Sequence, residues 1–287
     1  MKQFLFLILC VISFNISSAQ TESIQENFEG EILIRVYQYY PKEAQKVMQC
    51  HSGVDTVRIL IKGEKIISYN TSTQVTSIIN PNSTITFYPF IQKGIETPTI
   101  IPDNDAIEMI KQSYTFINNE NPIKINGVEC NIIIAQKSDY GGTNIITLAI
   151  AKNSINLPYS VRQLLDFNMI SNGIAMRTIN EHKKSGTANS LSKIGSLMTG
   201  LKLSNDNSFD LYLAQEIISI TKKPIDSSNF EIPNGIKLEK FETNDILSIN
   251  KVSSELQKKN YKYLRSKKLL HEDSEKRTFA ISDDWNL

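Results

Sequence analysis

The sequence predicts a mainly β protein of the α+β class that ends in a C-terminal helical extension. Apolar and polar residues alternate with period two through most of the chain, which is typical of strands that bury one face. Clusters of Gly, Pro, Asn and Asp interrupt this alternation and predict turns between the strands. Near Thr243 the alternation stops and the charge density rises, so a helix is expected from there on.

The first five alternating runs follow one another closely enough to predict an antiparallel meander. Gly63-Glu64 predicts a tight hairpin between the second and third runs, because glycine accepts the backbone conformation that such turns require. Asn80-Pro81-Asn82 predicts a turn before the fifth run. The predicted strands cover residues 31–40, 56–61, 65–69, 74–79 and 84–88.

The middle of the chain predicts loops, short helices and more strands. A proline-containing loop is expected over 89–102, and an acidic start followed by apolar residues predicts a short helix over 103–112. A second short helix is expected over 159–169, and 185–203 is interpreted as a loop followed by an apolar helix or a flap. Turns are predicted at 140–143, 226–230 and 233–235. Further strands are predicted over 114–117, 123–137, 145–151, 173–182, 209–221 and 236–241.

The first 19 residues have the three-part layout of a secretory signal peptide. Lys2 supplies a positive charge, an apolar run covers 4–12, and small residues lead to a cleavage site after Ala19. The alternative is a buried N-terminal strand or helix. A lipid anchor at Cys10 is not expected, because Leu9 rather than a small residue precedes it. The mature protein is therefore expected in the periplasm or outer envelope, with no transmembrane segment, since no other apolar stretch reaches the roughly 20 residues required.

Charge and cysteine content narrow the function classes. The chain has 31 Lys and Arg residues against 30 Asp and Glu residues, so no overall field draws it to nucleic acid. Cleavage of the signal peptide leaves Cys50 and Cys130, which an oxidising compartment often pairs in a disulfide. Alternatively, Cys130 is a buried apolar thiol in its predicted strand. With so few cysteines and three scattered histidines, neither a zinc site nor another cofactor is predicted.

Six segments occur in an order that resembles a known family. They are FEGEI (28–32), VRILIKGEKI (57–66), IINP (78–81), TITFYPF (84–90), INGVEC (125–130) and IDSSNFEIPNGIK (225–237). Together they resemble an uncharacterised family of exported Bacteroidota proteins whose domain is grouped with the lipoprotein carriers (LolA/LolB-like). The resemblance implies a strongly bent, antiparallel half-barrel sheet with short helices covering its concave side, which holds acyl chains in the carriers. The expected organisation is a signal peptide (1–19), a LolA-like β domain (20–242) and a C-terminal helix with a polar tail (243–287).

Aromatic residues of the first and fifth predicted strands are the candidate ligand-binding group. Tyr37, Tyr39, Phe87 and Phe90 would line an apolar cleft if, as expected, neighbouring strands supply both pairs. Leu197 and Met198, in the apolar segment expected to cover the sheet, complete the predicted site. The alternative is ordinary packing of these rings between the sheet and its helices.

Two short patterns would suit catalysis, although the chain is not predicted to be an enzyme. Ser190 and Lys193 fit S-x-x-K, in which a lysine assists a serine nucleophile, but the companion motifs are missing. Glu181 and His182 would suit acid–base chemistry, yet adjacent strand residues point to opposite faces. The sequence contains no H-E-x-x-H, P-loop, G-x-S-x-G or dinucleotide fingerprint.

The expected function is therefore non-catalytic binding of an apolar or lipidic ligand in the concave face of the sheet. The alternative is an envelope protein–protein interaction module whose core is filled by its own side chains, with a hydrolase of unknown type third. The C-terminal helix carries a basic stretch that would suit an envelope protein partner or anionic lipid headgroups. The change of composition near Thr243 predicts that the residues beyond it add little to the core, and a single apolar stripe is too thin for a sustained coiled coil. The basic residues are Lys258, Lys259, Lys262, Arg265, Lys267 and Lys268.

Overall fold

In the described part of the chain, twelve strands form one open, strongly bent sheet. The computed structural model describes residues 28–41, 52–99, 108–109, 111–139, 142–152, 173–184, 211–242 and 245–270. The strands are β1 (Glu29–Tyr39), β2 (Gly53–Lys62), β3 (Lys65–Asn70), β4 (Thr76–Ile79), β5 (Ser83–Tyr88), β6 (Lys93–Pro98), β7 (Thr115–Ile125), β8 (Val128–Asp139), β9 (Gly142–Ala151), β10 (Ala175–Lys184), β11 (Leu211–Lys222) and β12 (Lys237–Lys240).

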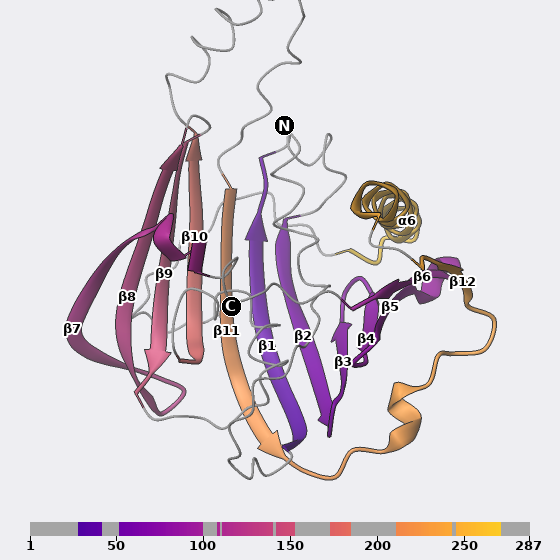
Figure 1. Ribbon diagram of the computed structural model, residues 1–287, viewed down its shortest axis with the longest axis horizontal. Helices are drawn as coiled ribbons and strands as arrows, with labels where there is room; N and C mark the ends of the chain where they lie inside the picture. Colours follow the sequence, from indigo (N-terminus) through magenta and orange to yellow (C-terminus); the bar gives the residue numbers. More distant parts are fainter. Residues whose placement is uncertain are drawn as a thin grey trace, which may run out of the picture.

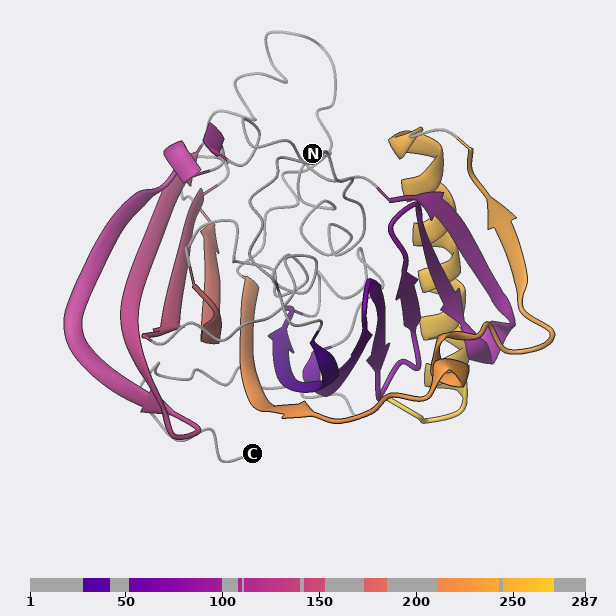
Figure 2. The same ribbon diagram turned by 60° about the horizontal axis from the view of Figure 1, so that its bottom comes forward.

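The spatial order of the strands is β12-β6-β5-β4-β3-β2-β1-β11-β10-β9-β8-β7. Figures 1 and 2 show a horseshoe in which β7 to β10 form one arm and β3 to β6 form the other. β1 and β11 pair in the middle and join the two arms. Among the described residues β12 and β7 are the edges, so the sheet is not closed. The mainly β class is therefore confirmed.

The predicted antiparallel meander from the first to the fifth strand is confirmed. Gly63 has a φ of 59°, in the left-handed region, and turns the chain between β2 and β3 as expected. The prediction of a wholly antiparallel sheet is wrong at one edge, where β12 runs parallel to β6. A long connection makes this pairing possible, because β12 enters the sheet after β11 rather than after β6.

Two strand boundaries differ from the sequence predictions. The predicted loop over 89–102 is wrong, because a 3₁₀ turn, η1 (Pro89–Ile91), leads into β6. Gly94 permits this strand, since a Cβ there would lie 2.6 Å from the Thr86 carbonyl oxygen. The single strand predicted over 123–137 is also wrong. The chain reverses at Asn126-Gly127, where φ is 49° and 81°, as a primed hairpin turn requires.

The largest buried cluster joins the two halves of the horseshoe. Isoleucines of β1, β2 and β3 belong to the same cluster as residues of β7, β8 and β9. Met176 of β10 and Ile217 of β11 also belong to it, so the cluster runs without interruption along the sheet order from β3 to β7. The members include Ile32, Ile59, Ile61, Ile66, Ile125, Cys130 and Ala149.

The chain that follows β11 covers the β3–β6 arm on both faces. Residues 223–238, here called the closing segment, include the 3₁₀ turn η2 (Ser227–Phe230) and pack against a cluster that contains Phe87. The next residue, Tyr88, points to the opposite face. There the helix α6 (Ile246–Ser266) packs Leu256 against Tyr88 and Ile95.

The predicted C-terminal helix is confirmed as α6, but the expectation that it adds little to the core is wrong. Leu264 is 0% exposed, and Leu256 belongs to a buried cluster with strand residues. Asp245 caps the helix by accepting a hydrogen bond from the Ser248 amide at 3.2 Å. The apolar stripe was visible in the sequence, but a stripe does not reveal whether a sheet face lies available to receive it.

The described residues do not support the short covering helices. Within the segment 103–112, helical residues are described at 108–109 and 111–112, and Met109 is 72% exposed, so its side chain covers no part of the sheet. The segments 159–169 and 190–203 lie outside the described residues. The cover that is described comes from α6 and the closing segment.

Candidate functional site

The described aromatic candidates lie in separate packing environments. Tyr37 is 0% exposed and packs edge-on against Tyr212, with 5.9 Å between ring centroids, in a cluster that Tyr39 joins from its edge. Phe87 is buried beneath the closing segment, and Phe90 stacks on Tyr263 of α6 at 5.6 Å. The expectation that neighbouring strands supply both pairs is wrong, since β2, β3 and β4 separate β1 from β5. Leu197 and Met198 lie outside the described residues.

A buried ion pair occupies the middle of the sheet and was not foreseen from the sequence. The Arg177 Nε donates a hydrogen bond of 2.7 Å to Glu216 Oε2, and the two side chains are 5% and 7% exposed. Asn126 Nδ2, in the turn between β7 and β8, donates to Glu216 Oε1 at 3.1 Å. Each member of the pair lies among other polar residues of its predicted strand, so the sequence offers no specific signal for it.

This ion pair marks the point where the sheet divides. β10 and β11 pair from Arg177–Glu216 to His182–Leu211, whereas β11 continues beyond Glu216 in register with β1. Asn126 Nδ2 also donates to the Ile217 carbonyl oxygen at 2.7 Å, one residue past the last β10–β11 pair. The asparagine therefore satisfies a backbone acceptor at the division, and the arrangement explains the polar cluster as structural.

Glu181 and His182 take different neighbours at the far end of β10. Glu181 lies opposite Tyr212 on β11, and His182 lies opposite Leu211. Because successive strand residues point to opposite faces, the two side chains do not converge on one side of the sheet. Ser190 and Lys193, the other catalytic candidates, lie outside the described residues.

Cys130 is buried within β8, as one of its two sequence interpretations requires. Its Sγ donates a hydrogen bond to the Val128 carbonyl oxygen at 3.4 Å. Burial raises the pKa of the thiol to about 11, which disfavours the reactive thiolate at neutral pH. Cys50 lies outside the described residues, so the Cys50–Cys130 disulfide stays a prediction.

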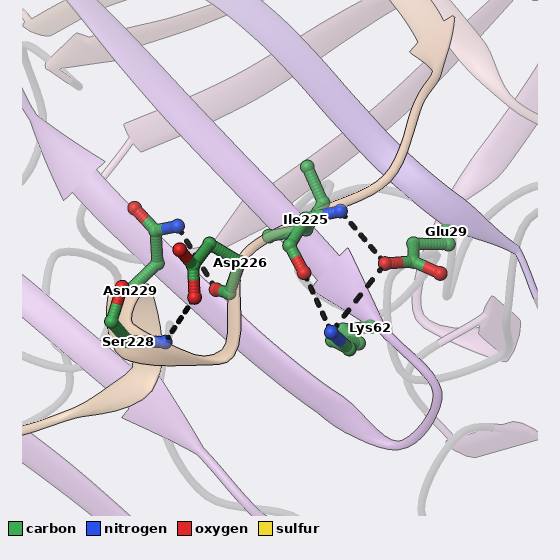
Figure 3. Close-up of polar contacts among 6 residues, drawn as sticks. All are labelled: Glu29, Lys62, Ile225, Asp226, Ser228 and Asn229. Carbon is green, nitrogen blue, oxygen red and sulfur yellow. Dashed lines mark hydrogen bonds and ion pairs between the residues drawn. The ribbon is translucent and has the colours of Figure 1, made fainter.

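A polar clamp fastens the closing segment to the sheet (Figure 3). Glu29 Oε1 accepts a hydrogen bond from the Ile225 amide at 2.7 Å, and Lys62 Nζ donates to the Ile225 carbonyl oxygen at 2.7 Å. Asp226 then accepts a hydrogen bond from the Ser228 amide at 2.9 Å. The hydrogen bonds from Ser228 hold the pKa of the Asp226 carboxyl below its usual value. The IDSSN sequence is thus accounted for by anchoring and turn formation.

The two edges of the sheet differ in length and surface chemistry. β12 has four residues, and three of them are exposed charged residues: Lys237, Glu239 and Lys240. β7 has eleven residues and exposes Phe116 at 40% and Ile117 at 54%. Short, charged edges resist pairing with another chain, whereas an edge segment with exposed apolar side chains, such as the start of β7, favours it. The β7 edge is therefore the candidate interaction surface of the sheet.

The described residues contain no group of three or more His, Cys, Asp or Glu side chains placed to hold a metal ion. Across the same described ranges, none of the helices combines the length and apolar character needed to cross a bilayer.

Comparisons with known proteins add little beyond these observations. No family model and no curated protein matches the chain. Among solved structures, an uncharacterised conserved protein from Thermus thermophilus is similar with a TM-score of 0.37 and 5% identity, over 76% of this chain and 94% of that one. A structure of PNGF-II in C2 space group has a TM-score of 0.35 and 13% identity, over 78% of this chain and 33% of that one. At these TM-scores neither similarity bears on function.

Proposed function

We propose that the protein is a non-catalytic interaction module of the cell envelope that binds an extended segment of a partner protein along β7. The exposure of Phe116 and Ile117 on this edge strand is the observation that carries the proposal. Backbone groups on the outer side of an edge strand can add a further strand, while side-chain contacts give specificity. The proposal thus gives a use to the one long edge of the described sheet.

Packing in the interior supports a module rather than a container. The largest buried cluster contains side chains from β1, β2 and β3 together with side chains from β7, β8 and β9. The buried Arg177–Glu216 pair is satisfied by its own hydrogen bonds. Both features are accounted for by the stability of the fold, as expected of a module whose side chains pack against one another.

The N-terminal part of β7 is the proposed attachment site. Phe116 lies on the same face as Tyr114, with 6.5 Å between ring centroids, whereas Ile117 points to the other face. An added strand would therefore meet an apolar side chain on each face of the sheet. Beyond Asn119 the register with β8 is irregular and Pro122 follows, two features that oppose regular pairing. The site is accordingly limited to residues 115–119.

A photo-crosslinking group at Thr115, introduced into the full-length protein in its native envelope, tests this proposal. We expect a discrete protein adduct whose yield falls about tenfold in Ile117→Lys, because a charge replaces a buried apolar contact. Ile232→Lys is the matched control, since Ile232 is similarly apolar and 36% exposed away from this edge. Equal adduct yields in both variants, or no discrete adduct, would overturn the proposal.

The open, bent sheet favours a second candidate, the binding of an apolar or lipidic ligand on its concave side. The predicted contributions of Leu197 and Met198 to such a site belong to this candidate. An apolar fluorescent probe would then bind the native protein saturably and be displaced by long-chain fatty acid or lysolipid. Leu197→Asp or Met198→Asp should weaken that binding while the far-ultraviolet circular dichroism stays unchanged. Absence of saturable binding would reject this candidate and leave the β7 proposal untouched.

A further inference from the structure

The exposed side of α6 concentrates positive charge. Lys251, Lys258 and Lys262 are exposed and spaced by seven and four residues, so they lie along one stripe of the helix. Glu255, the acidic residue within α6, is exposed and lies between Lys251 and Lys258 on the same stripe, so the stripe carries three positive charges and one negative charge. The whole chain has a formal net charge of only +1, so this stripe is a local feature. The exposed lysines of α6 and the turn after it are Lys251, Lys258, Lys259, Lys262, Lys267 and Lys268.

Packing on the opposite side of α6 holds the lysine stripe in place. Leu256 and Leu264 are buried, and Asn260 Nδ2 donates to the Thr73 carbonyl oxygen at 3.2 Å. Burial raises the pKa of Tyr88, partly offset by a hydrogen bond with Ser253 of α6. Because the inner side makes both apolar and polar contacts, the helix presents its outer side in one fixed orientation.

Exposed leucines flank the lysines at both ends. Leu247 in the first turn is 69% exposed, and Leu269 just after the last turn is 44% exposed. The 21 residues of α6 span about 30 Å, so the two leucines lie near opposite ends of the helix. Figure 2 shows α6, in yellow, running along the β3–β6 arm of the horseshoe. A straight helix suits a flat partner.

We propose that α6 docks the protein on an anionic lipid surface, with the lysines at the phosphate groups and Leu247 and Leu269 entering the interfacial region. A membrane surface has a layer of charged headgroups above an apolar layer. Basic residues with flanking apolar residues are typical of helices that lie at such a surface. A folded acidic protein would offer charge without an apolar layer that both leucines could enter. This docking is separate from the proposed strand addition at β7, on the other arm of the sheet.

Vesicle co-sedimentation of the full mature protein tests the docking. We expect binding to phosphatidylcholine vesicles that contain about 30% phosphatidylglycerol, and little binding to pure phosphatidylcholine. The binding should weaken as salt rises from 50 to about 500 mM, because the Debye length shortens. The triple variant Lys251→Gln, Lys258→Gln, Lys262→Gln should lose roughly a hundredfold in partition coefficient.

A second triple variant separates a specific surface from general charge. Lys65→Gln, Lys124→Gln, Lys237→Gln removes the same charge at exposed positions on strands, and it should keep most of the binding. Leu247→Ser, Leu269→Ser should weaken binding at high salt more than at low salt, because the apolar contribution is not screened. Circular dichroism checks that each variant is folded.

Three outcomes would overturn the proposal. Equal losses in the two lysine variants would show that only net charge matters. Equal binding to the anionic and the pure phosphatidylcholine vesicles would show that binding does not depend on lipid charge. No binding to the anionic vesicles at 50 mM salt would reject the membrane surface and favour a soluble acidic protein as the partner of the lysine stripe. None of these results depends on crosslinking at β7, so the two proposals fail separately.

Discussion

The two arms of the horseshoe differ in what covers their faces and in the chemistry of their edge strands. The β3–β6 arm is covered on one face by the closing segment and on the other by α6, and β12 extends its edge. The β7–β10 arm has a buried cluster that includes Ala135, Ile146 and Leu148, but its edge strand exposes Phe116 and Ile117. One arm therefore has both faces covered and ends in the short, charged strand β12, whereas the other ends in the longer strand β7 with exposed apolar side chains.

This difference has its origin in the order of the chain. The cover, the edge strand and the helix of the first arm all come from residues 223–266, after both arms have been made. The β3–β6 arm is thus completed by a segment distant in sequence, whereas the β7–β9 hairpins pair with their sequence neighbours. Changes in the C-terminal segment should therefore damage one arm and spare the other.

The largest effect is expected from removal of α6. Truncation after Phe241 would expose Tyr88 and Ile95 and delete the buried Leu256 and Leu264. Since each buried leucine is worth about 2–5 kcal/mol, the melting temperature should fall by more than about 10 °C. Thermal melting followed by circular dichroism measures this. Unchanged melting would show that α6 contacts the arm without stabilising it.

A matched pair of single substitutions sharpens the same comparison. Leu264→Ala should lower the free energy of unfolding by about 2–5 kcal/mol, and Leu247→Ala, at a 69% exposed position of the same helix, by less than about 0.5 kcal/mol. Hydrogen exchange should report greater opening in β5 and β6 than in β8 for Leu264→Ala. Uniform loss of protection across both arms would contradict the independence of the two arms.

The next effect concerns the ion pair where the arms join. Glu216→Gln leaves the Arg177 charge buried without its carboxylate and should cost about 3–5 kcal/mol. The double variant Arg177→Met, Glu216→Leu removes both charges and should recover a large part of that loss. Urea denaturation of the two variants and the wild type provides the comparison. A double variant less stable than Glu216→Gln would show that the arms need the ion pair itself.

The anchor of the closing segment should have a smaller effect, confined to one arm. Ile225 is buried beside Leu60 and Phe87, so Ile225→Ala should cost about 2–4 kcal/mol. Ile232→Ala, in the same segment but 36% exposed, should cost less than about 1 kcal/mol. Chemical denaturation measures both. Similar losses in the two variants would contradict a single anchor point.

The strands were the most predictable part of the fold, because period-two alternation records burial directly. β6 was missed because Gly94 and Pro98 lie within a short run, and the sequence does not show that glycine is needed for close approach to Thr86. The Asn126-Gly127 turn was missed although the dipeptide is a strong hairpin signal. Its alternating flanks on both sides were interpreted as one continuous strand.

The candidate site was less predictable than the fold. Phe87 and Tyr88 are adjacent in the sequence but lie on opposite faces, one beneath the closing segment and one beneath α6. Alternation reveals that such residues are buried, but not which distant segment covers them. Arg177 and Glu216 meet because β10 and β11 are neighbours, a pairing that only the strand order supplies. Exposure of Phe116 likewise depends on β7 being an edge.

The smallest effect is expected at Glu31, on β1 in the middle of the sheet, where Lys223 at the start of the closing segment contacts it. Burial favours its protonated form, but hydrogen bonds from Arg58 and Lys223 outweigh burial and hold the pKa of the carboxyl below its usual value. A lowered pKa in the folded state stabilises the protein above the unfolded-state value of about 4.3, and this contribution is lost as the pH falls through the folded-state pKa. Because Arg58 and Lys223 are each more than a third exposed, Glu31→Gln should cost only about 1 kcal/mol at pH 7.

The dependence on pH separates Glu31 from an ordinary surface carboxylate. The difference in unfolding free energy between wild type and Glu31→Gln should shrink as the pH falls below about 4 and vanish once Glu31 is protonated in both states. Glu129→Gln is the control, since Glu129 is 52% exposed and lies 3.6 Å from Lys152 Nζ, and it should have little effect at either pH. If the Glu31 difference persists at pH 2, the side chain stabilises the sheet through packing rather than charge.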